Sequence, residues 1–478
     1  MIPILTVLII VVLVARFILK GYKAEPVLLI AGLALMIFTI ALGWGPILPK
    51  NVATTGITWL DPFEVMRDLF SSRAADLGLM IMALMGFAQY MDHIGANEAV
   101  VRVATKPLKN MRSPYVLLFF SFLLASILQL AIPSATGLAV LLMGTMFPIM
   151  IGLGLSPASA AGVIATSLGV AYTPTAIDAI RGAKAVDMSV VEYVLYYQGP
   201  AALATVLVVG ITHIFWQRHC DRKQGFVPEI GKAVQSNEKA ESKKSVPGYY
   251  AFLPMLPIVM AVGTSNLFFA GIHLDVVTIV LIAMAICMVI ETLRVRNFKL
   301  VCNGFQTFLN GMGHAFSNVV GLLVAAGVFA HGIKVSGAID QLILGAESVG
   351  LPPFAMAIVF ALVTLAAAII MGSGNAPFLA FVELIPQIAH SMGVNPIAMI
   401  LPMQQASHMG RGMSPVAGVI IAVSSGAKLQ PFDVVKRTAV PLMVRFVAHC
   451  AIIGIFLLIT IFIIHIIKAG NIPAFTFS

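Results

Sequence analysis

The chain has 478 residues, of which 59% are hydrophobic and only 10% are charged. Soluble domains carry about 25% charged residues, so this composition excludes water as the main solvent of the chain. Apolar stretches of roughly 20 residues, the length needed to cross a bilayer, recur from end to end. The formal net charge is +9, but the Lys and Arg residues lie in short loops, which indicates membrane orientation rather than nucleic-acid binding. The sequence predicts an all-α polytopic membrane protein.

Predicted spans and two longer apolar stretches follow one another along the chain. The first half contains spans at 2–20, 24–43, 74–95, 156–180 and 192–216. The second half contains spans at 249–268, 274–293, 305–333, 396–425 and 438–467. Between the third and fourth span of each half, the stretches 114–151 and 353–391 are too long for one helix and are broken in the middle. We interpret both as re-entrant hairpins, with tips at 133–137 and 372–377.

The distribution of Lys and Arg predicts the orientation. With both hairpins re-entrant, one side carries 20 of the 29 Lys and Arg residues, in the loops 16–23, 92–113, 217–247, 294–299 and 426–437. This side is predicted to be cytoplasmic, which places both termini on the opposite, outer side of the membrane. An odd number of spans per half gives the halves opposite orientations. Residues 1–216 and 248–478 are therefore predicted to form two inverted repeats, joined by a cytoplasmic linker at 217–247.

Similar residues in the two halves support a duplication. Gly86-Phe87-Ala88 resembles Val328-Phe329-Ala330, and Ser134 precedes Pro148 by the same 14 residues that separate Gly372 from Pro386. Further along, Pro174 and Pro200 correspond in order to Pro415 and Pro441. Each match is weak by itself, but their common order indicates a repeat.

Four polar breaks interrupt the apolar segments, at 133–137, 172–175, 372–377 and 407–415. Such breaks are tolerated at membrane depth only where protein or a water-filled cavity covers the backbone. We expect a new helix after each break, with Thr136, Thr173, Asn375 and Ser414 as N-caps and Pro174 and Pro415 at the first helical position. The alternative is that the breaks are kinks that bend helices for packing, but their corresponding places in both halves favour a site.

Helix N-termini bind anions such as carboxylates, and the carbonyl ends of the arriving helices suit Na⁺. The breaks are therefore predicted to hold an anionic substrate. The candidate substrate-binding residues are Ser134, Ala135, Thr136, Gly137, Thr173, Pro174, Thr175, Ser373, Gly374, Asn375, Ala376, Ser407, His408, Arg411, Ser414 and Pro415.

Arg411 is interpreted as the one Lys or Arg deep within an apolar segment, where a cation costs about 3 kcal/mol or more. Its planar fork suits bidentate carboxylate recognition, so we expect it to bind substrate. A structural partner, either an acid or backbone carbonyls, is the alternative. Arg445 is expected to extend to the nearby membrane surface.

Intramembrane acids are candidates for coupling to H⁺ or Na⁺. Asp178 follows the Pro174 break by one turn and ranks first, Glu383 follows the second hairpin tip and ranks next, and Asp76 ranks lower. Ser134 and Asn375 are added as hairpin-tip candidates for the same ions.

No cofactor, and no metal other than Na⁺, is expected. Four scattered cysteines, Cys220, Cys287, Cys302 and Cys450, show no metal-ligand spacing, and the sequence has no P-loop for ATP-driven transport. Ser373 and His408 suggest a nucleophile and base, but the flanking sequence lacks a GxSxG elbow. We predict that the chain is not an enzyme.

The chain resembles the DcuC family of anaerobic C4-dicarboxylate carriers in the runs RAADLGLMIM (73–82), HIGAN (93–97), SATG (134–137), GSGNAPF (372–378), FVELIP (381–386), SPVAG (414–418) and VVKR (434–437). The resemblance implies a scaffold domain and a transport domain, paired hairpins and usually a homodimer. It also implies exchange or efflux of succinate, fumarate, malate or aspartate. Related carriers have Ser-Asn-Thr at the hairpin tips, whereas this chain has Ser134-Ala135-Thr136 and Ser373-Gly374-Asn375.

The main hypothesis is a secondary carrier of C4-dicarboxylates with elevator-like alternating access. A carrier for amino acids, peptides or another small organic anion is a second hypothesis, and a passive anion channel is a third. Trans-stimulation of uptake separates a carrier from a channel.

Overall fold

The computed structural model describes residues 2–20, 22–49, 52–111, 113–169, 172–227, 246–264, 274–339, 341, 345 and 352–468, and these residues contain helices and no strand. The helices of the first half are α1 Ile2–Leu19, α2 Ala24–Ala41, α3 Asp61–Arg73, α4 Leu79–His93, α5 Ala96–Ala104, α6 Pro114–Ala131, α7 Ala135–Gly152, α8 Pro157–Ser167, α9 Ile177–Ala185, α10 Val190–Glu192 and α11 Gly199–Lys223. Those of the second half are α12 Leu256–Gly263, α13 Val276–Val295, α14 Phe298–Ala315, α15 Gly321–Val335, α17 Pro353–Met371, α18 Ala376–Phe381, α19 Ile385–Ser391, α20 Ile397–Gly412, α21 Gly418–Ala427 and α22 Pro431–Lys468.

Short segments of other helix types join or precede several of these helices. The π-helical segments are η1 Ala74–Gly78, η3 Tyr193–Gln198 and η6 Phe316–Val320, and the 3₁₀ segments are η2 Lys106–Asn110 and η5 Gly248–Met255. Eight helices in the described part of the chain are long and apolar enough to cross a membrane. The chain is thus a multi-pass, all-helical membrane protein, as its composition predicts.

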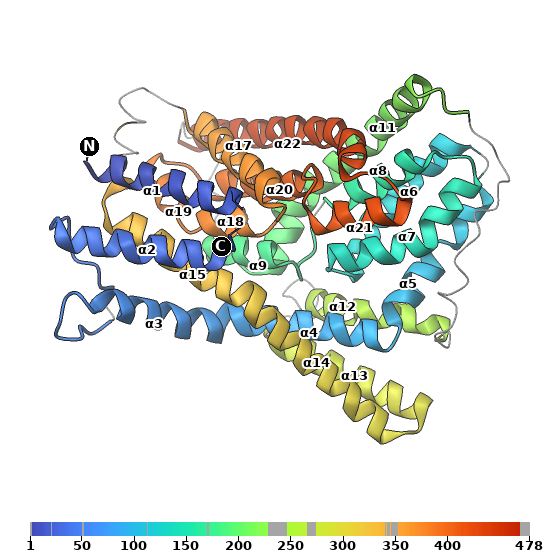
Figure 1. Ribbon diagram of the computed structural model, residues 1–478, viewed down its shortest axis with the longest axis horizontal. Helices are drawn as coiled ribbons and strands as arrows, with labels where there is room; N and C mark the ends of the chain where they lie inside the picture. The colour runs from blue at the N-terminus through green and yellow to red at the C-terminus, as the bar shows by residue number, and fades with distance from the viewer. Residues whose placement is uncertain are drawn as a thin grey trace.

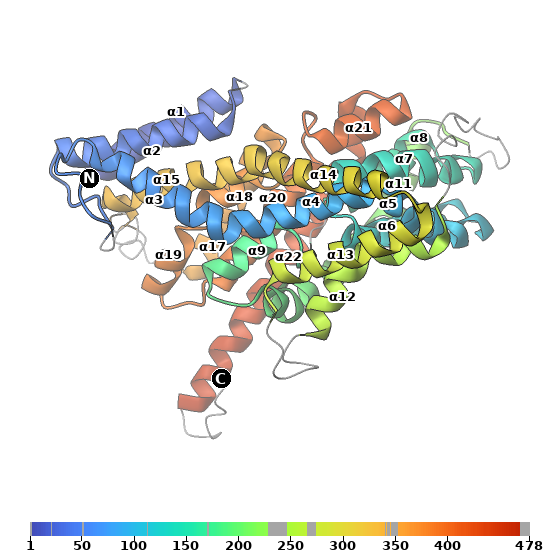
Figure 2. The ribbon, with the colours of Figure 1, turned by 90° about the horizontal axis from the view of Figure 1, so that it is seen from below.

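Two long interrupted helices run along the molecule side by side (Figure 2). One is α3, η1 and α4, and the other is α14, η6 and α15. They meet at their π-helical segments, where a Cβ on Gly78 would lie 3.2 Å from a methyl carbon of Val320. Because π-helical segments within α-helices often mark functional positions, this crossing is a candidate site of movement.

Glycines let these helices and α2 approach closely. A Cβ on Gly32 of α2 would lie 2.6 Å from the carbonyl of Val328 on α15, and a Cβ on Gly86 of α4 would lie 2.7 Å from the carbonyl of Phe308 on α14. Small residues at such crossings are typical of helix packing in membranes. We call the group formed by α2, α3, α4, α14 and α15 the crossed-helix group.

A second group of helices packs together and contains α6, α7, α8, α11, α21 and α22. Buried apolar side chains from each of these helices belong to one hydrophobic cluster. In Figure 1, α6 and α7 lie toward the right of the molecule, whereas α17, α18 and α19 lie toward the left. The two broken apolar stretches therefore approach the middle of the molecule from opposite ends.

Several predicted segments differ from the observed helices. The predicted third span, 74–95, is only the second part of a helix that begins at Asp61, because α3 continues into it through η1. The stretch 353–391 contains three helices rather than two, since the chain turns again between α18 and α19. The two helices of the stretch 114–151, α6 and α7, have 18 residues each. This length suits either one arm of a re-entrant hairpin or a short membrane span.

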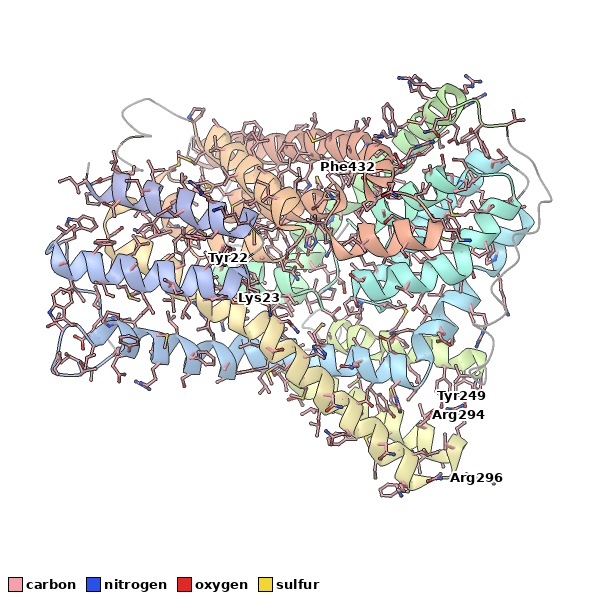
Figure 3. The ribbon with its side chains drawn as sticks, in the orientation of Figure 1. Tyr22, Lys23, Tyr249, Arg294, Arg296 and Phe432 are labelled. Atoms are coloured by element: carbon pink, nitrogen blue, oxygen red, sulfur yellow. The ribbon has the colours of Figure 1, made fainter. Side chains whose placement is uncertain are left out.

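The chain following the linker is fixed to the end of α13. The guanidinium of Arg294 lies 4.9 Å from the ring centroid of Tyr250 and 2.6 Å from Glu291, and Figure 3 places Tyr249 beside Arg294 at the same corner of the molecule. Residues 228–245 of the predicted linker lie outside the described residues.

Candidate functional site

The four predicted breaks come together in space. A Cβ on Gly418, just after the fourth break, would lie 3.2 Å from the hydroxyl of Thr136 in the first. A Cβ on Gly372 in the third would lie 3.0 Å from the backbone nitrogen of Ala417. Gly372 also ends α17 with a φ of +66°, a conformation that favours glycine. Residues of all four breaks also line one cavity, so the breaks lie together in one region.

A cavity lies where these segments meet, beside the second break. Its lining comes from α4, α6, the first hairpin tip, the second break, the start of α9, the N-cap of α18 and the end of α20: Met85, Gln129, Pro133, Thr173, Thr175, Ala176, Ile177, Asp178, Asn375, His408 and Arg411. The cavity thus combines one guanidinium, one carboxylate, one imidazole and several hydroxyl and amide groups. Such a mixture suits a small polar ligand.

Asp178 is the centre of a polar network at this cavity and is 1% exposed. Its Oδ2 lies 2.9 Å from Nε2 of His408 and accepts a hydrogen bond of 2.6 Å from the side chain of Gln404. The hydroxyl of Tyr193 donates to Oε1 of Gln404 at 2.8 Å. The network connects α9, η3 and α20, so it fixes the carboxylate in place.

Arg411 reaches the cavity from the last turn of α20. Its Nη2 donates to the carbonyl of Leu168, which also accepts a hydrogen bond of 3.1 Å from Gln129. A carbonyl has two lone pairs, so both are used. Gly374 at the second hairpin tip lies against the guanidinium, because a Cβ there would be 3.3 Å from Nη1 of Arg411 and 2.9 Å from Nδ1 of His408.

Arg445 does not extend to the membrane surface, so that prediction is wrong. Its side chain is fully buried, and it donates to the carbonyl of Gly169 at 2.7 Å and to Oε1 of Gln405. The carbonyls of Leu168 and Gly169 follow the end of α8, where a helix leaves acceptors unpaired. The interpretation of Arg411 as the one deep Lys or Arg is wrong for the same reason.

The chain matches a known protein family over most of its length. The profile of DcuC, described as the C4-dicarboxylate anaerobic carrier, matches residues 2–462. The chain belongs to the DcuC family. The chain is 43% identical to Escherichia coli DcuC, named an anaerobic C4-dicarboxylate transporter, over 92% of this chain and 93% of the relative. A Vibrio cholerae relative of the same family is 39% identical, over 96% of this chain and 98% of its own length.

Solved structures of low sequence identity share the fold. Neisseria gonorrhoeae MtrF, described in a class of antimetabolite efflux pumps, aligns with a TM-score of 0.58 and 14% identity over 91% of this chain and 96% of MtrF. The Alcanivorax borkumensis YdaH transporter aligns with a TM-score of 0.59 and 15% identity over 90% of this chain and 98% of YdaH. The prediction that the chain belongs with transporters and not with enzymes is confirmed by its DcuC relatives.

The helices after the breaks begin differently from the prediction. Ser134, not Thr136, caps α7, by accepting a hydrogen bond from the backbone of Gly137 at 3.2 Å. The N-caps of α9 and α21 are Ala176 and Ala417, so Thr173 and Ser414 are not caps and Pro174 and Pro415 are not first helical residues. The chain makes a further turn after each proline before the helix starts.

Asn375 is at the N-cap position of α18 as predicted, but its side chain makes no capping bond. The hydroxyl of Ser373 instead accepts from the backbone of Ala376 at 3.2 Å. Ser407 donates to the carbonyl of Gly374, which holds α20 to the second hairpin tip. Both serines are therefore used in shaping the tip.

The ion-coupling candidates have different surroundings. Asp178 and Asn375 line the cavity, and Ser134 caps a helix. Glu383 is not among the lining residues and pairs with Arg73 and Arg181. Asp76 belongs to η1, and its side chain lies outside the described part of the structure.

Sequence reasoning missed Gln129, Gln404 and Tyr193, which lie within or beside the site. Gln129 is a single amide in an otherwise apolar helix, four residues before Pro133. An amide in that position has to find a partner in the protein, and this was a usable signal. Gln404 precedes His408 and Arg411 by four and seven residues on α20, the spacing of one helix face.

Proposed function

We propose that the chain is a secondary active transporter of C4-dicarboxylates such as succinate, fumarate, malate and aspartate. Family membership and the names of the relatives support this substrate class. The observation that carries the proposal is the position of Arg411, whose guanidinium lines the cavity between the breaks. A planar fork of N–H donors matches a carboxylate in two parallel hydrogen bonds.

The site provides a different environment for the second carboxylate of the substrate. The N-termini of α7 and α9 lie next to cavity-lining residues, Pro133 and Ala176, and unpaired N–H groups there favour an anion. The hydroxyls of Thr173 and Thr175 lie 2.8 Å apart at the same edge and add donors. In this proposal, Arg411 binds one carboxylate while these helix starts and hydroxyls bind the other.

We also propose two inverted repeats that move the site between the two sides of the membrane in an elevator-like manner. The order of elements supports this, since a helix interrupted by a π segment precedes a broken apolar stretch in each half. The approach of these stretches from opposite ends is a second support (Figure 1). In this arrangement the crossed-helix group belongs to the scaffold domain.

Transport proceeds in this proposal by exchange or by ion-coupled uptake or efflux. We favour H⁺ over Na⁺ at the second break, because the Leu168 carbonyl already accepts two hydrogen bonds and the Gly169 carbonyl accepts one from Arg445. Asp178 is the one carboxylate in the lining of the cavity, so it is the proposed proton-coupling group. The proposal includes a homodimer in a bacterial inner membrane, with both termini in the periplasm.

Uptake of radiolabelled succinate into proteoliposomes tests the proposed function. Vesicles are loaded with succinate, with aspartate or with no substrate. We expect internal succinate and aspartate to stimulate uptake, which a passive channel does not do. Absence of succinate uptake together with transport of an amino acid or peptide would instead favour the second hypothesis.

A further inference from the structure

Glu383 is shared by two arginines that come from distant parts of the chain. Its Oε1 lies 2.6 Å from Nη2 of Arg181 and 2.9 Å from Nη2 of Arg73. Glu383 lies in the turn between α18 and α19, Arg181 lies on α9, and Arg73 is the last residue of α3. The cluster therefore joins the second broken stretch to α9 and to the crossed-helix group.

The contact with Arg181 lies beside the site, on the helix that carries Asp178. Arg181 follows Asp178 by three residues on α9, so the two side chains leave the same short helix one turn apart. Its side chain is 6% exposed and that of Glu383 is 14% exposed. A carboxylate this deeply buried is destabilising unless it is paired, so the Arg181 contact keeps α9 and the second hairpin together.

The contact with Arg73 has a different energetic character. The Arg73 side chain is 23% exposed, compared with 6% for Arg181, so Arg73 is the less buried of the two arginines. If this contact breaks, Glu383 keeps Arg181 as its partner. The Glu383 carboxylate is then not left buried and unpaired, which is the condition that makes the loss of a buried ion pair costly. The Arg73 contact is therefore the releasable one of the two.

The position of Arg73 also fits a contact between moving parts. Arg73 directly precedes the π-helical segment η1, and α18 packs on α15 of the crossed-helix group. On α15, a Cβ at Gly327 would lie 3.8 Å from Oε1 of Glu383 and 3.9 Å from Nε of Arg73. Because Gly327 has no side chain, the surface of α15 beside Glu383 and Arg73 is flat at this position.

We infer that Glu383 is a positioning residue for transport, and that its contact with Arg73 breaks each time the site changes sides while its contact with Arg181 persists. The inference rests on the proposed alternating access, and it adds which contact is released. Glu383 acts through α9 and the hairpin and touches no substrate.

Reversible cross-linking tests the inference in the full-length chain. Cys220, Cys287, Cys302 and Cys450 are replaced by serine, and two cysteine pairs are then introduced: Arg73→Cys with Glu383→Cys, and Arg181→Cys with Glu383→Cys. Each pair is bridged by a short bis-methanethiosulfonate reagent that a thiol reductant removes. Succinate exchange and succinate binding are measured before bridging, after bridging and after reduction, so each variant is its own control.

We expect the bridge between positions 73 and 383 to stop exchange, to leave succinate binding intact and to be reversed by reduction. The bridge between positions 181 and 383 should leave exchange at the rate of the reduced protein. Exchange at an undiminished rate across the 73–383 bridge would overturn the inference. If the reduced variants and the cysteine-free parent neither bind nor exchange succinate, the proposed function fails instead.

A single substitution provides a second test if a cysteine pair fails to fold. Arg73→Gln should change the maximal exchange rate by about threefold, the order expected for a partly exposed ion pair, while KM for succinate is unchanged. Arg73→Lys keeps the charge and should restore the rate. Wild-type KM and maximal rate in Arg73→Gln would contradict the inference.

Discussion

Arg437 and Asp221 form a buried ion pair that closes α22 onto α11, with Nη1 of the arginine 2.8 Å from Oδ1 of the aspartate. Their side chains are 2% and 1% exposed. Asp221 also accepts from the hydroxyl of Ser156 at 2.7 Å, and Arg437 donates to Gln224 at 2.6 Å. Because Ser156 is the N-cap of α8, the pair fixes three helices at one end of the molecule.

Loss of one partner should therefore be costly. We expect Arg437→Met to lower the free energy of unfolding by about 3 to 5 kcal/mol, the cost of a buried charge that has lost its partner. The double variant Arg437→Met with Asp221→Leu should recover part of this loss. Reversible unfolding in detergent micelles measures both changes.

A matched control lies in the same turn of the chain. Lys436 and Asp433 form an ion pair of 3.2 Å with side chains 75% and 47% exposed. Lys436→Gln should cost about 1 kcal/mol or less, because solvent screens such pairs. Equal losses from Arg437→Met and Lys436→Gln would show that burial does not set the strength of the Arg437 pair.

Asp61 gives a pH dependence at the loop before α3. Its carboxylate accepts a hydrogen bond of 2.8 Å from the backbone nitrogen of Thr55, and this bond is the main cause that lowers the pKa of Asp61 below its usual value of 3.8. A lowered pKa means that the carboxylate stabilises the loop above pH 3.8 and that this contribution is lost as the pH falls through the lower folded value. In the wild type, the hydrogen-exchange rate of the Thr55 amide, corrected for its intrinsic rate, should rise as the pH falls through the folded-state pKa of Asp61. Asp61→Asn should remove that dependence.

Much of this fold follows from hydropathy and from helix-breaking residues. The predicted bounds 2–20 and 24–43 agree with α1 and α2, because these helices are apolar except for one charged residue near an end of each. Helix α3 was missed, since its sequence DPFEVMRDLFSSR is too polar for a span. A search for apolar segments does not find α3. This helix nevertheless extends the third predicted span by 13 residues.

The sequence predicts where the candidate site lies, but not which hydrogen bonds and ion pairs its residues form. Gly and Pro residues within apolar segments indicated the four breaks, and the lining of the cavity includes Thr173, Asn375 and Arg411 as expected. The pairing of Glu383 with Arg181 joins residues about 200 positions apart in sequence. No local pattern encodes such a contact, because it depends on how α9 packs against the second hairpin.

Asp178 is expected to couple transport to pH. Asp178→Asn should remove the pH dependence of net succinate uptake while counterflow exchange continues, because exchange needs no net ion movement. Uptake and exchange in proteoliposomes between about pH 5.5 and 8, the range of most proton-coupled changes, measure this. Asp433→Asn, at an exposed carboxylate, is the control and should keep the wild-type profile. A wild-type pH profile in Asp178→Asn would assign a structural role to Asp178.

Arg411 is expected to bind a substrate carboxylate, since it is the one cation in the lining of the cavity. Arg411→Lys keeps the charge but loses the planar fork, so we expect apparent affinity to fall by about tenfold, or roughly 1.4 kcal/mol. Arg411→Ala should nearly abolish succinate binding without preventing folding. Thermal shift of the purified protein with increasing succinate, measured alongside uptake, determines both affinities.

Arg445 provides the matched control for Arg411. Both arginines donate to carbonyls just after α8, but Arg445 does not belong to the lining of the cavity. Arg445→Lys should lower thermal stability, because it removes donors from buried acceptors, and should leave the affinity for succinate within about threefold of wild type, a difference below 1 kcal/mol. If Arg411→Ala folds and binds succinate as tightly as the wild type, Arg411 has the same structural role as Arg445. In that case the helix starts and hydroxyls around the cavity bind the anion without it.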